Sequence, residues 1–450
     1  MKKNVLDSAD SPISAIILAG GFGTRMKSKI PKVIHKICGK EMLFCIIDEV
    51  AKLSDDIHIV LYNEADLIKN AICKQYGEFV EKSLYLHLQD YAHFPGTAGA
   101  IMQGINSTNP KAPIHTKYER ILILSGDMPL IRAESLIRFA QSKSEIALGI
   151  LELENATGYG RVIMDDDKVS AIIEEKDADE SQKAINLANA GIYCLNRALL
   201  ESALPQIDSH NNQNEFYLTD IIKFSDDICG IVANERDFMG VNSKSELAKA
   251  EEFMLERLRE NAMKNGAILH ISHSIYIEFG VEFEGECEIE NGAVLKGKTK
   301  IVNSKILSHS VVESSVIKNS SIGPFARIRP NSFIKSSHIG DFVEVKNSHL
   351  VDIKAGHLSY LGDSEIDSGT NIGAGVITCN YDGINKHRTQ IGKGVFVGSG
   401  TQIVAPVKIE DNVLIAAGSV VTKDAKSGDL VLARSKQINK AGFFYKFFAK

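Results

Sequence analysis

A six-residue repeat in the C-terminal part of the chain constrains its fold more than any other feature. Six residues form one short strand and its corner, so three hexads close a triangular coil whose aliphatic side chains stack on those of the next coil. The repeat therefore predicts a parallel β-helix solenoid over most of residues 275–425. Its aliphatic positions form three runs: Ile391, Val397, Ile403, Ile409, Ile415 and Val421; Phe283, Ile289, Leu295 and Ile301; and Ile322, Ile328 and Ile334.

Two segments depart from this period. The register slips by three residues between Val351 and Ile366 and by one residue between Thr378 and Ile391. A solenoid tolerates insertions as loops that leave its surface, so we expect polar loops at "KAGHLSYLGD" and "NYDGINKHR". Such loops indicate a site between neighbouring coils or chains, although solvated loops with an incidental histidine are the alternative. The groups able to do chemistry there are His357, Tyr360, Asp363, Asn380, Tyr381, Lys386 and Arg388.

The first 240 residues follow a different pattern. Apolar strands over 120–127 and 145–153 alternate with helical stretches such as 41–53, which predicts an α/β domain around a mostly parallel sheet. Residues 243–266 predict a helix that begins with a capping box at Ser243 and Glu246. This pattern agrees with two interpretations, a rigid connector between the domains and an ordinary packed helix. We thus expect a flexible tail over 1–12, an α/β domain over 13–242, a linker helix over 243–266 and a solenoid domain with a C-terminal tail over 267–450.

A glycine-rich loop follows the first predicted strand, in "ILAGGFGTRMKSKIPK" over 17–32. Successive backbone N–H groups form an anion-binding concavity, and Arg25 and Lys32 add positive charge, so the loop predicts a site for a triphosphate or a sugar phosphate. A dinucleotide-binding fingerprint fails because Met26 stands at its third glycine, and no Walker sequence closes the stretch. A simple turn remains the alternative.

Charge and cysteine content narrow the classes of partner. The net charge of -6, from 51 basic and 57 acidic residues, argues against a nucleic-acid binder that works by phosphate neutralisation. The seven cysteines are scattered singly, which fits a reducing cytoplasm. No segment approaches the length of an apolar membrane span, so we expect no stable membrane insertion.

Nine motifs together resemble one bacterial family, the bifunctional N-acetylglucosamine-1-phosphate uridyltransferases and glucosamine-1-phosphate N-acetyltransferases. The resemblance covers roughly residues 13–440. It implies a Rossmann-like α/β nucleotidyltransferase with a mostly parallel sheet, followed by a left-handed parallel β-helix of hexapeptide repeats. The motifs are "LAGGFGTRMKSKIPKVIHKICGK", "SGDMPL", "TGYGRV", "NAGIY", "GVN", "IGPFARIRP", "KAGHLSYLGD", "NIGAGVITCNYDG" and "VFVGSGTQIVAPV".

For the N-terminal half, the resemblance implies attack of N-acetylglucosamine 1-phosphate on the α-phosphorus of UTP, with Arg25 and Lys32 as the catalytic cations. It also implies Mg²⁺ held by Asp127 and Asn242. The sequence departs from the usual family pattern in two places. The segment "QDYAHFPGT" is two residues longer than in the family, and Ser125 stands where many relatives have an aromatic residue. The implied nucleotide residues are Leu18, Ala19, Gly20, Gly21, Gln89, Gly96 and Thr97, and the implied sugar residues are Gly160, Glu174 and Asn189.

For the C-terminal half, the resemblance implies acetyl transfer from acetyl-CoA to glucosamine 1-phosphate, with His357 as general base. It also implies a homotrimer with its acetyltransferase sites at the junctions between chains. The implied sugar-phosphate residues are Arg329, Lys346, Tyr360, Asn371, Asn380 and Tyr381, and the implied acetyl-CoA residues are Ala374, Ser399, Ala417 and Arg434.

Three other functions remain open at this point. A single-activity sugar-nucleotide pyrophosphorylase would explain the N-terminal half, with the solenoid serving assembly or regulation. A purely structural or binding solenoid is the second. The third is a metal-dependent hydratase using solenoid histidines, which are His338, His349, His357 and His387.

Overall fold

The computed structural model describes residues 12–166 and 168–448. The chain divides into two compact units, with the division between Met254 and Leu255. Apart from Pro12, the tail predicted over 1–12 lies outside the described residues. None of the helices in the described ranges has the length and apolar character needed to cross a membrane.

The first unit is built on a mostly parallel sheet with the strand order β11-β7-β10-β6-β1-β4-β5. Strand β10 runs antiparallel to both its neighbours, while β1, β4, β5 and β6 are mutually parallel. The predicted strands over 120–127 and 145–153 are confirmed as β6 and β7. The bounds are β1 (Ile13–Leu18), β4 (Asp56–Leu61), β5 (Leu84–Leu88), β6 (Arg120–Ser125), β7 (Ile146–Glu152), β10 (Leu187–Asn196) and β11 (Ile228–Val232).

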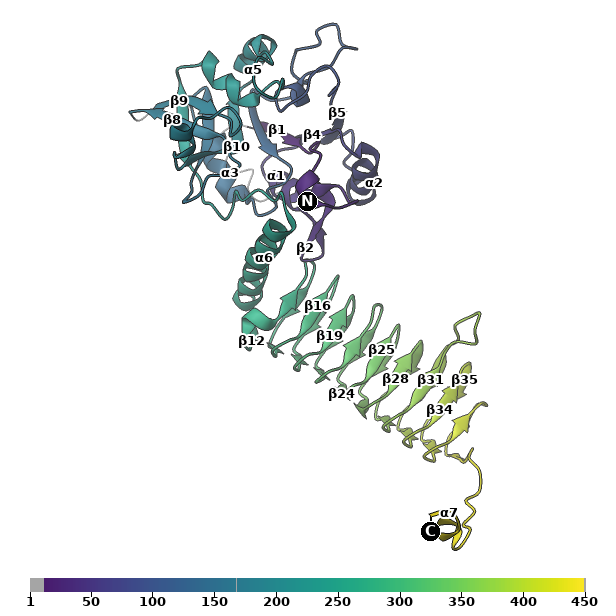
Figure 1. The fold of residues 1–450 in the computed structure, drawn as a ribbon. Helices are drawn as coiled ribbons and strands as arrows, with labels where there is room; N and C mark the ends of the chain where they lie inside the picture. The colour runs from purple at the N-terminus through teal and green to yellow at the C-terminus, as the bar shows by residue number, and fades with distance from the viewer. Residues whose placement is uncertain (1–11, 167, 449–450) are drawn as a thin grey trace. The chain divides into compact units, whose positions relative to one another are not determined.

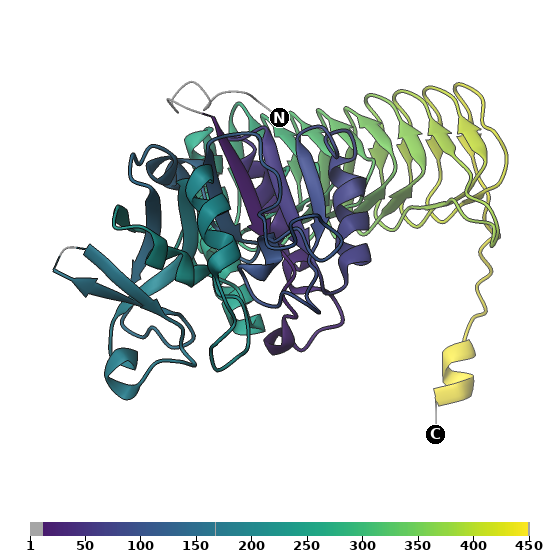
Figure 2. The same cartoon turned by 90° about the horizontal axis from the view of Figure 1, so that it is seen from above.

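Helices cover both faces of this sheet (Figure 1). Ala15 and Ile17 of β1 pack into one hydrophobic cluster and Ile16 packs into another. Burial on both faces explains why β1 reads as an unbroken apolar run. A hairpin of β8 (Arg161–Asp165) and β9 (Lys168–Ile173) projects from the sheet (Figure 2). The remaining elements of this unit include β2 (Lys36–Ile37), β3 (Lys40–Glu41), α1 (Met42–Val50), α2 (Ala65–Tyr76), α3 (Ala133–Ala140), α4 (Glu180–Lys183) and α5 (Arg197–Ala203).

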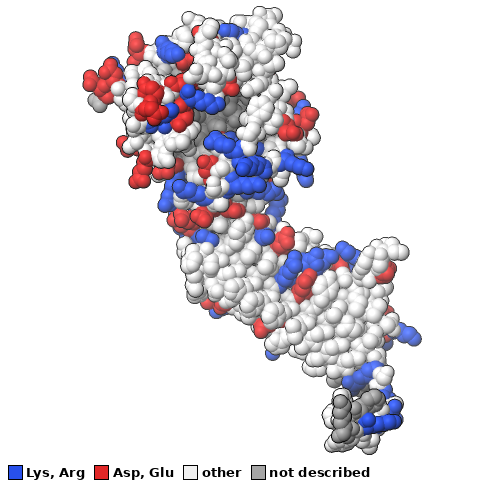
Figure 3. All heavy atoms as spheres, viewed as in Figure 1, with Lys and Arg blue, Asp and Glu red and all other residues white. Residues whose placement is uncertain are grey.

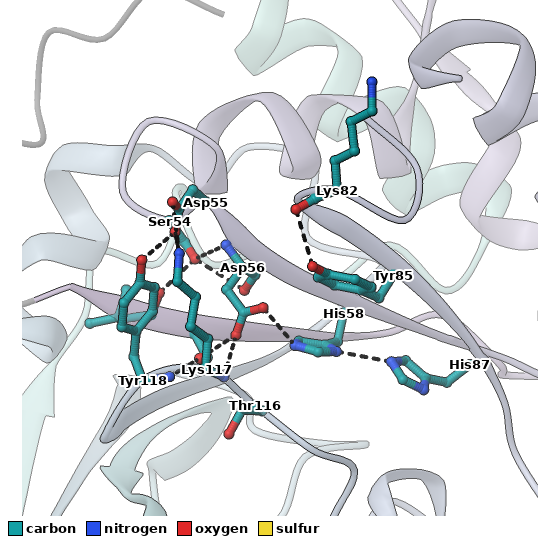
Figure 4. Close-up of polar contacts among 12 residues, drawn as sticks. Ser54, Asp55, Asp56, His58, Lys82, Tyr85, His87, Thr116, Lys117 and Tyr118 are labelled. Carbon is teal, nitrogen blue, oxygen red and sulfur yellow. Dashed lines mark hydrogen bonds and ion pairs between the residues drawn. The ribbon is translucent and has the colours of Figure 1, made fainter. Parts of the chain in front are cut away.

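A polar network lies at the amino end of β4 (Figure 4). The buried His58 ring lies between the Asp56 carboxylate, 3.2 Å from its Nε2, and the His87 ring, 2.9 Å from its Nδ1. Asp56 also accepts hydrogen bonds from Ser14 Oγ and from the backbone N–H of Lys117. These bonds satisfy a carboxylate that would otherwise be costly to bury.

The helix predicted over 243–266 is observed as α6 (Lys244–Lys264). The backbone N–H of Glu246 donates to Ser243 Oγ at 3.2 Å, as a capping box requires. The Glu246 carboxylate, however, accepts from the backbone N–H of Asn242 at 2.7 Å. The helix start thus fixes the backbone of a residue assigned to the metal site.

The second unit is a left-handed parallel β-helix whose strands run from β12 (Ala267–Leu269) to β38 (Leu430–Val431). They form three parallel sheets of ten, nine and eight strands. The aliphatic residues of the hexads are buried in one continuous core. Serine hydroxyls at the corners accept backbone N–H groups from the next coil, as Ser304 does from Ser320 and Ser320 from Ser337. A short helix α7 (Phe443–Phe448) follows the solenoid.

The structure corrects one of the two predicted loops. "KAGHLSYLGD" is not a loop, because its residues form β27 (Lys354–His357) and β28 (Tyr360–Gly362) within regular coils. The shift in period reflects a short coil, in which His349 pairs with Glu365 sixteen positions further on. The second loop is confirmed. It interrupts the solenoid between β31 (Ile377–Cys379) and β32 (Thr389–Ile391).

Candidate active sites

A cavity of about 410 Å³ opens at the carboxyl edge of the first unit's sheet. Strands β1, β5 and β6 end there, and the loops that follow them carry Gly20, Gln89 and Asp127. Ligands of open α/β sheets bind at this edge. Lys and Arg side chains lie around a hollow on the face of this unit drawn in Figure 3.

Most residues assigned to the nucleotide and sugar line this cavity. Among the assigned residues, the lining includes Leu18, Gly20, Gly21, Lys32, Gln89, Gly96, Thr97, Asp127, Glu174 and Asn189. Four others do not line it. Ala19 is buried, Gly160 accepts the backbone N–H of Asn189 at 2.8 Å, and Asn242 contacts Lys32. Arg25 is exposed on a short 3-10 helix, η2 (Thr24–Met26).

A charged centre lies at the glycine-loop end of the cavity. The Lys32 ammonium forms an ion pair with the Asp127 carboxylate and donates to Asn242 Oδ1 at 2.9 Å. The backbone carbonyl of Asp127 accepts from Val241 N–H at 2.8 Å, which joins the two loops. Gly23 adopts a φ of +60°, and a Cβ there would lie 2.8 Å from Lys32 Cβ. Only glycine allows this approach.

The donors at this centre fit Mg²⁺. Carboxylate and amide oxygens are hard ligands, and Mg²⁺ commonly uses one or two such protein ligands together with substrate phosphates. The Lys32 ammonium contacts both oxygens, so they already face a position that stabilises positive charge. Among the residues that the structure describes, no cluster of three or more His, Cys, Asp or Glu side chains suits a metal.

The lining of the cavity also includes polar groups suited to a sugar. Glu174 accepts a hydrogen bond from Thr219 Oγ1 at 3.2 Å, and burial raises the pKa of its carboxyl. The Asn189 amide donates to the hydroxyl of Tyr193 at 2.7 Å and accepts from Gly191 N–H at 3.0 Å. These bonds fix the amide that is assigned to the sugar.

The "QDYAHFPGT" segment forms part of the cavity wall. Gln89 Nε2 donates to the carbonyls of Phe94 and Gly96 at 3.0 and 3.1 Å, so the amide anchors the loop. Sequence reasoning missed three aromatic side chains that line the cavity, Phe22, Tyr91 and Tyr193. The ring centroids of Phe22 and Tyr91 are 5.4 Å apart with an edge-on orientation.

In the second unit, His357 and the assigned acetyl-CoA residues form one column. His357 ends β27, and Ala374, Ser399 and Ala417 follow the next three strands of the same sheet. Gly400 N–H donates to the Ala374 carbonyl and Gly418 N–H to the Ser399 carbonyl, both at 2.8 Å. Arg434 Nη1 donates to the Ala417 carbonyl at 2.7 Å.

A cluster of cations contains two of the assigned sugar-phosphate residues. The contact with the amino group of Lys386, followed by burial and the positive charge of Arg329, lowers the pKa of Lys346. Sequence reasoning placed Lys386 among the polar loop residues but assigned it no role. Beside this cluster, Asp363 accepts from the amides of Asn347 and Asn380.

The other assigned residues lie on nearby strands and in the loop after β31. Tyr360 begins β28, and its hydroxyl lies over Gly362, where a Cβ would come within 2.5 Å of it. Asn371 begins β30 (Asn371–Ile372), which pairs with β27. Tyr381 is 60% exposed in the loop after β31.

Comparison with known proteins finds matches to both units of the chain. A nucleotidyl transferase family model matches residues 14–227, and a bacterial hexapeptide transferase model matches residues 388–423. The "Bifunctional protein GlmU" of Helicobacter hepaticus is 53% identical over 97% of this chain and 98% of its own length. The proteins of the same name from Nitratiruptor sp. and Aliarcobacter butzleri are 51% and 50% identical, each over 97% of this chain and over 99% and 98% of their own lengths.

The fold and the comparisons define a nucleotidyltransferase joined to a hexapeptide-repeat transferase in one chain. The chain belongs to the GlmU family of bifunctional enzymes.

Proposed function

We propose that this enzyme makes UDP-N-acetylglucosamine, a precursor of peptidoglycan and lipopolysaccharide, in two steps. The second unit transfers the acetyl group of acetyl-CoA to the amine of glucosamine 1-phosphate and releases CoA. The first unit then transfers the uridylyl group of UTP to N-acetylglucosamine 1-phosphate and releases pyrophosphate. Full-length similarity to GlmU proteins supports the pairing of these activities.

The cavity in the first unit is the observation that supports uridylyl transfer. Its lining combines the glycine loop and Lys32, which suit phosphates, with Glu174 and Asn189, which suit a sugar, as a reaction between a nucleotide and a sugar phosphate requires. The sugar phosphate is itself the nucleophile, so the protein positions the two anions and stabilises their charge. Lys32 supplies a cation for this. Asp127 and Asn242 would hold Mg²⁺, which neutralises charge on the phosphate oxygens when bound.

The column that ends at His357 supports acetyl transfer. Neighbouring strands lie about 4.8 Å apart, so the three residues Ala374, Ser399 and Ala417 form a track along which an extended thioester donor reaches the imidazole. His357 accepts a proton from the attacking amine, and the thioester bond breaks to release CoA. Arg329, Lys346 and Lys386 attract the phosphate of the acceptor sugar.

An exposed ladder on one solenoid corner supports a homotrimer. We name it the corner ladder; its members are His309, Phe325, Phe342 and Leu358, which occupy equivalent corners of four consecutive coils. The rings of His309 and Phe325, and of Phe325 and Phe342, stack with centroids 5.2 and 5.4 Å apart. All four have positive φ angles, which are costly for bulky side chains. We infer that other copies of the chain cover this ladder, which adjoins His357.

Paired single-site variants test the two activities. We expect Asp127→Asn to abolish pyrophosphate release from UTP and N-acetylglucosamine 1-phosphate, while CoA release from acetyl-CoA and glucosamine 1-phosphate stays near normal. His357→Ala should give the opposite pattern. If the wild type released no CoA and His357→Ala kept the wild-type rate of pyrophosphate release, the single-activity pyrophosphorylase would be the better description. Since UTP and acetyl-CoA are intracellular metabolites, we further propose that the enzyme acts in the cytoplasm.

A further inference from the structure

The two oxygens assigned to the metal are both engaged by one side chain of the same chain. The Lys32 ammonium pairs with the Asp127 carboxylate and donates to Asn242 Oδ1 at 2.9 Å. The Lys32 and Asp127 side chains are each only 12% exposed. This is therefore a largely desolvated contact, in which a charge interaction is stronger than it would be at the surface.

The surrounding backbone holds all three groups in place. Gly23 packs against the stem of Lys32, and Glu246 accepts the backbone N–H of Asn242. Val241 N–H donates to the backbone carbonyl of Asp127. The ammonium is thus directed to the two oxygens by several independent contacts.

A divalent ion and an ammonium cannot share these oxygens without repelling each other. We propose that Lys32 competes with the metal ion for Asp127 and Asn242, and that the phosphates of an incoming nucleotide relieve the competition by attracting the ammonium. The side chain lines the same cavity as the glycine loop, so phosphates bound by that loop lie within the cavity that Lys32 faces. Metal affinity is then low until the nucleotide is present.

This inference rests on the proposed function, because it takes Asp127 and Asn242 as the metal ligands. It adds that Lys32, beyond assisting the reaction, couples metal binding to nucleotide binding. Such coupling is a linkage between two ligands, and it acts on equilibrium affinities. It is therefore measurable without turnover.

The test measures the affinity of the full-length protein for Mn²⁺ alone. The readout is the electron paramagnetic resonance signal of free Mn²⁺. Lys32→Met keeps the length of the side chain and removes its charge. If the ammonium occupies the two oxygens at least 90% of the time, the apparent affinity for Mn²⁺ should rise by about tenfold or more. Lys32→Gln serves as a second neutral variant should Lys32→Met fold poorly.

Two controls separate competition from general electrostatics. Lys29→Met removes one positive charge from the same exposed loop, and its Mn²⁺ affinity should stay within about twofold of the wild type because screening weakens exposed charges. Lys32→Arg keeps the charge and should bind Mn²⁺ as weakly as the wild type. Adding Asp127→Asn to Lys32→Met should remove the gain.

Two different results would overturn two different statements. If both neutral Lys32 variants bind Mn²⁺ no more tightly than the wild type, while Asp127→Asn still weakens binding, the competition is wrong and the metal site stands. If Asp127→Asn changes Mn²⁺ binding in neither background, the assignment of the metal ligands in the proposed function is wrong.

Discussion

Position 23 shows how one residue controls the first site. Gly23 has a φ of +60°, and a Cβ there would approach Lys32 Cβ to 2.8 Å. Left-handed backbone costs a non-glycine residue about 1–2 kcal/mol, and the clash would also displace the Lys32 stem. We expect Gly23→Ala to lower uridyltransferase kcat/KM by about tenfold, the equivalent of ~1.4 kcal/mol of transition-state stabilisation. Pyrophosphate release measures the effect. CoA release from the same preparation is the control and should be unchanged.

A second prediction concerns Lys386, whose contact lowers the pKa of Lys346. The repulsion between two neighbouring ammonium groups is relieved when a phosphate binds between them. Lys386→Met should therefore raise the KM for glucosamine 1-phosphate by about tenfold. The KM for acetyl-CoA should not change. Lys393→Met, on the exposed surface beyond the loop, is the matched control. If the two substitutions raised the KM equally, Lys386 would contribute only to the overall electrostatic potential of the solenoid and not to a specific phosphate contact.

Individual residues also show where sequence reasoning ends. Most residues that the motif resemblance named for the first unit line one cavity, and several of them lie in loops at the carboxyl edge of the sheet. The resemblance did not foresee that Phe22 and Tyr91 line the same cavity, because their contact joins the glycine loop to the unusual "QDYAHFPGT" segment. The pairing of Lys346 with Lys386 was also missed. It depends on how the loop folds back, which spacing alone does not determine.

Among the elements, β4 and β5 give a prediction about pH. His58 lies between Asp56 and His87 (Figure 4). Burial, followed by the charge of His58, lowers the pKa of His87 from 6.5 to about 4. Burial raises the pKa of Asp56, but hydrogen bonds from His58 and Ser14 outweigh it and bring the value to about 2.

Both shifts favour the deprotonated forms in the folded state. The His87 contribution is therefore complete above pH 6.5 and is lost as the pH falls to about 4, and that of Asp56 is lost below its unfolded value near 4. We expect the melting temperature to fall by several degrees between pH 7.5 and 4.5, measured by circular dichroism. His87→Gln keeps an acceptor for His58 without titrating. If this variant shows the same fall over that range, His87 is not its source.

The elements of the solenoid were predictable in period but not in every boundary. The buried hexads identify its strands because each aliphatic side chain stacks on an equivalent one in the next coil. The segment around His357 was nevertheless expected to be a loop. Coils there repeat after 16 residues, whereas Glu282 and Lys300 pair 18 positions apart in the first coils. Shorter corners absorb the difference, so a shift in period does not by itself indicate an insertion.

At the scale of the whole molecule, the corner ladder distinguishes one solenoid corner from the others. Asn303, Asn319 and Asn331 have positive φ angles at the other corners, where a short polar side chain tolerates this conformation. The corner ladder instead presents Phe325, Phe342 and Leu358, which are 49%, 59% and 62% exposed. Bulky apolar residues in a strained and exposed conformation are explained if contacts with another copy compensate their cost.

The last prediction follows from this contrast. Aspartate tolerates a positive φ better than phenylalanine, and neither ring belongs to the buried core, so Phe325→Asp combined with Phe342→Asp should leave the solenoid folded. We expect the wild type to sediment at three chain masses and the double variant at one. Acetyl transfer should be lost, because the corner ladder adjoins His357, while pyrophosphate release by the first unit persists. Asn331→Asp introduces a charge at another corner and should remain trimeric. A double variant that still sediments as a trimer would place the interface elsewhere, and the strain at Phe325 and Phe342 would then need a different compensation.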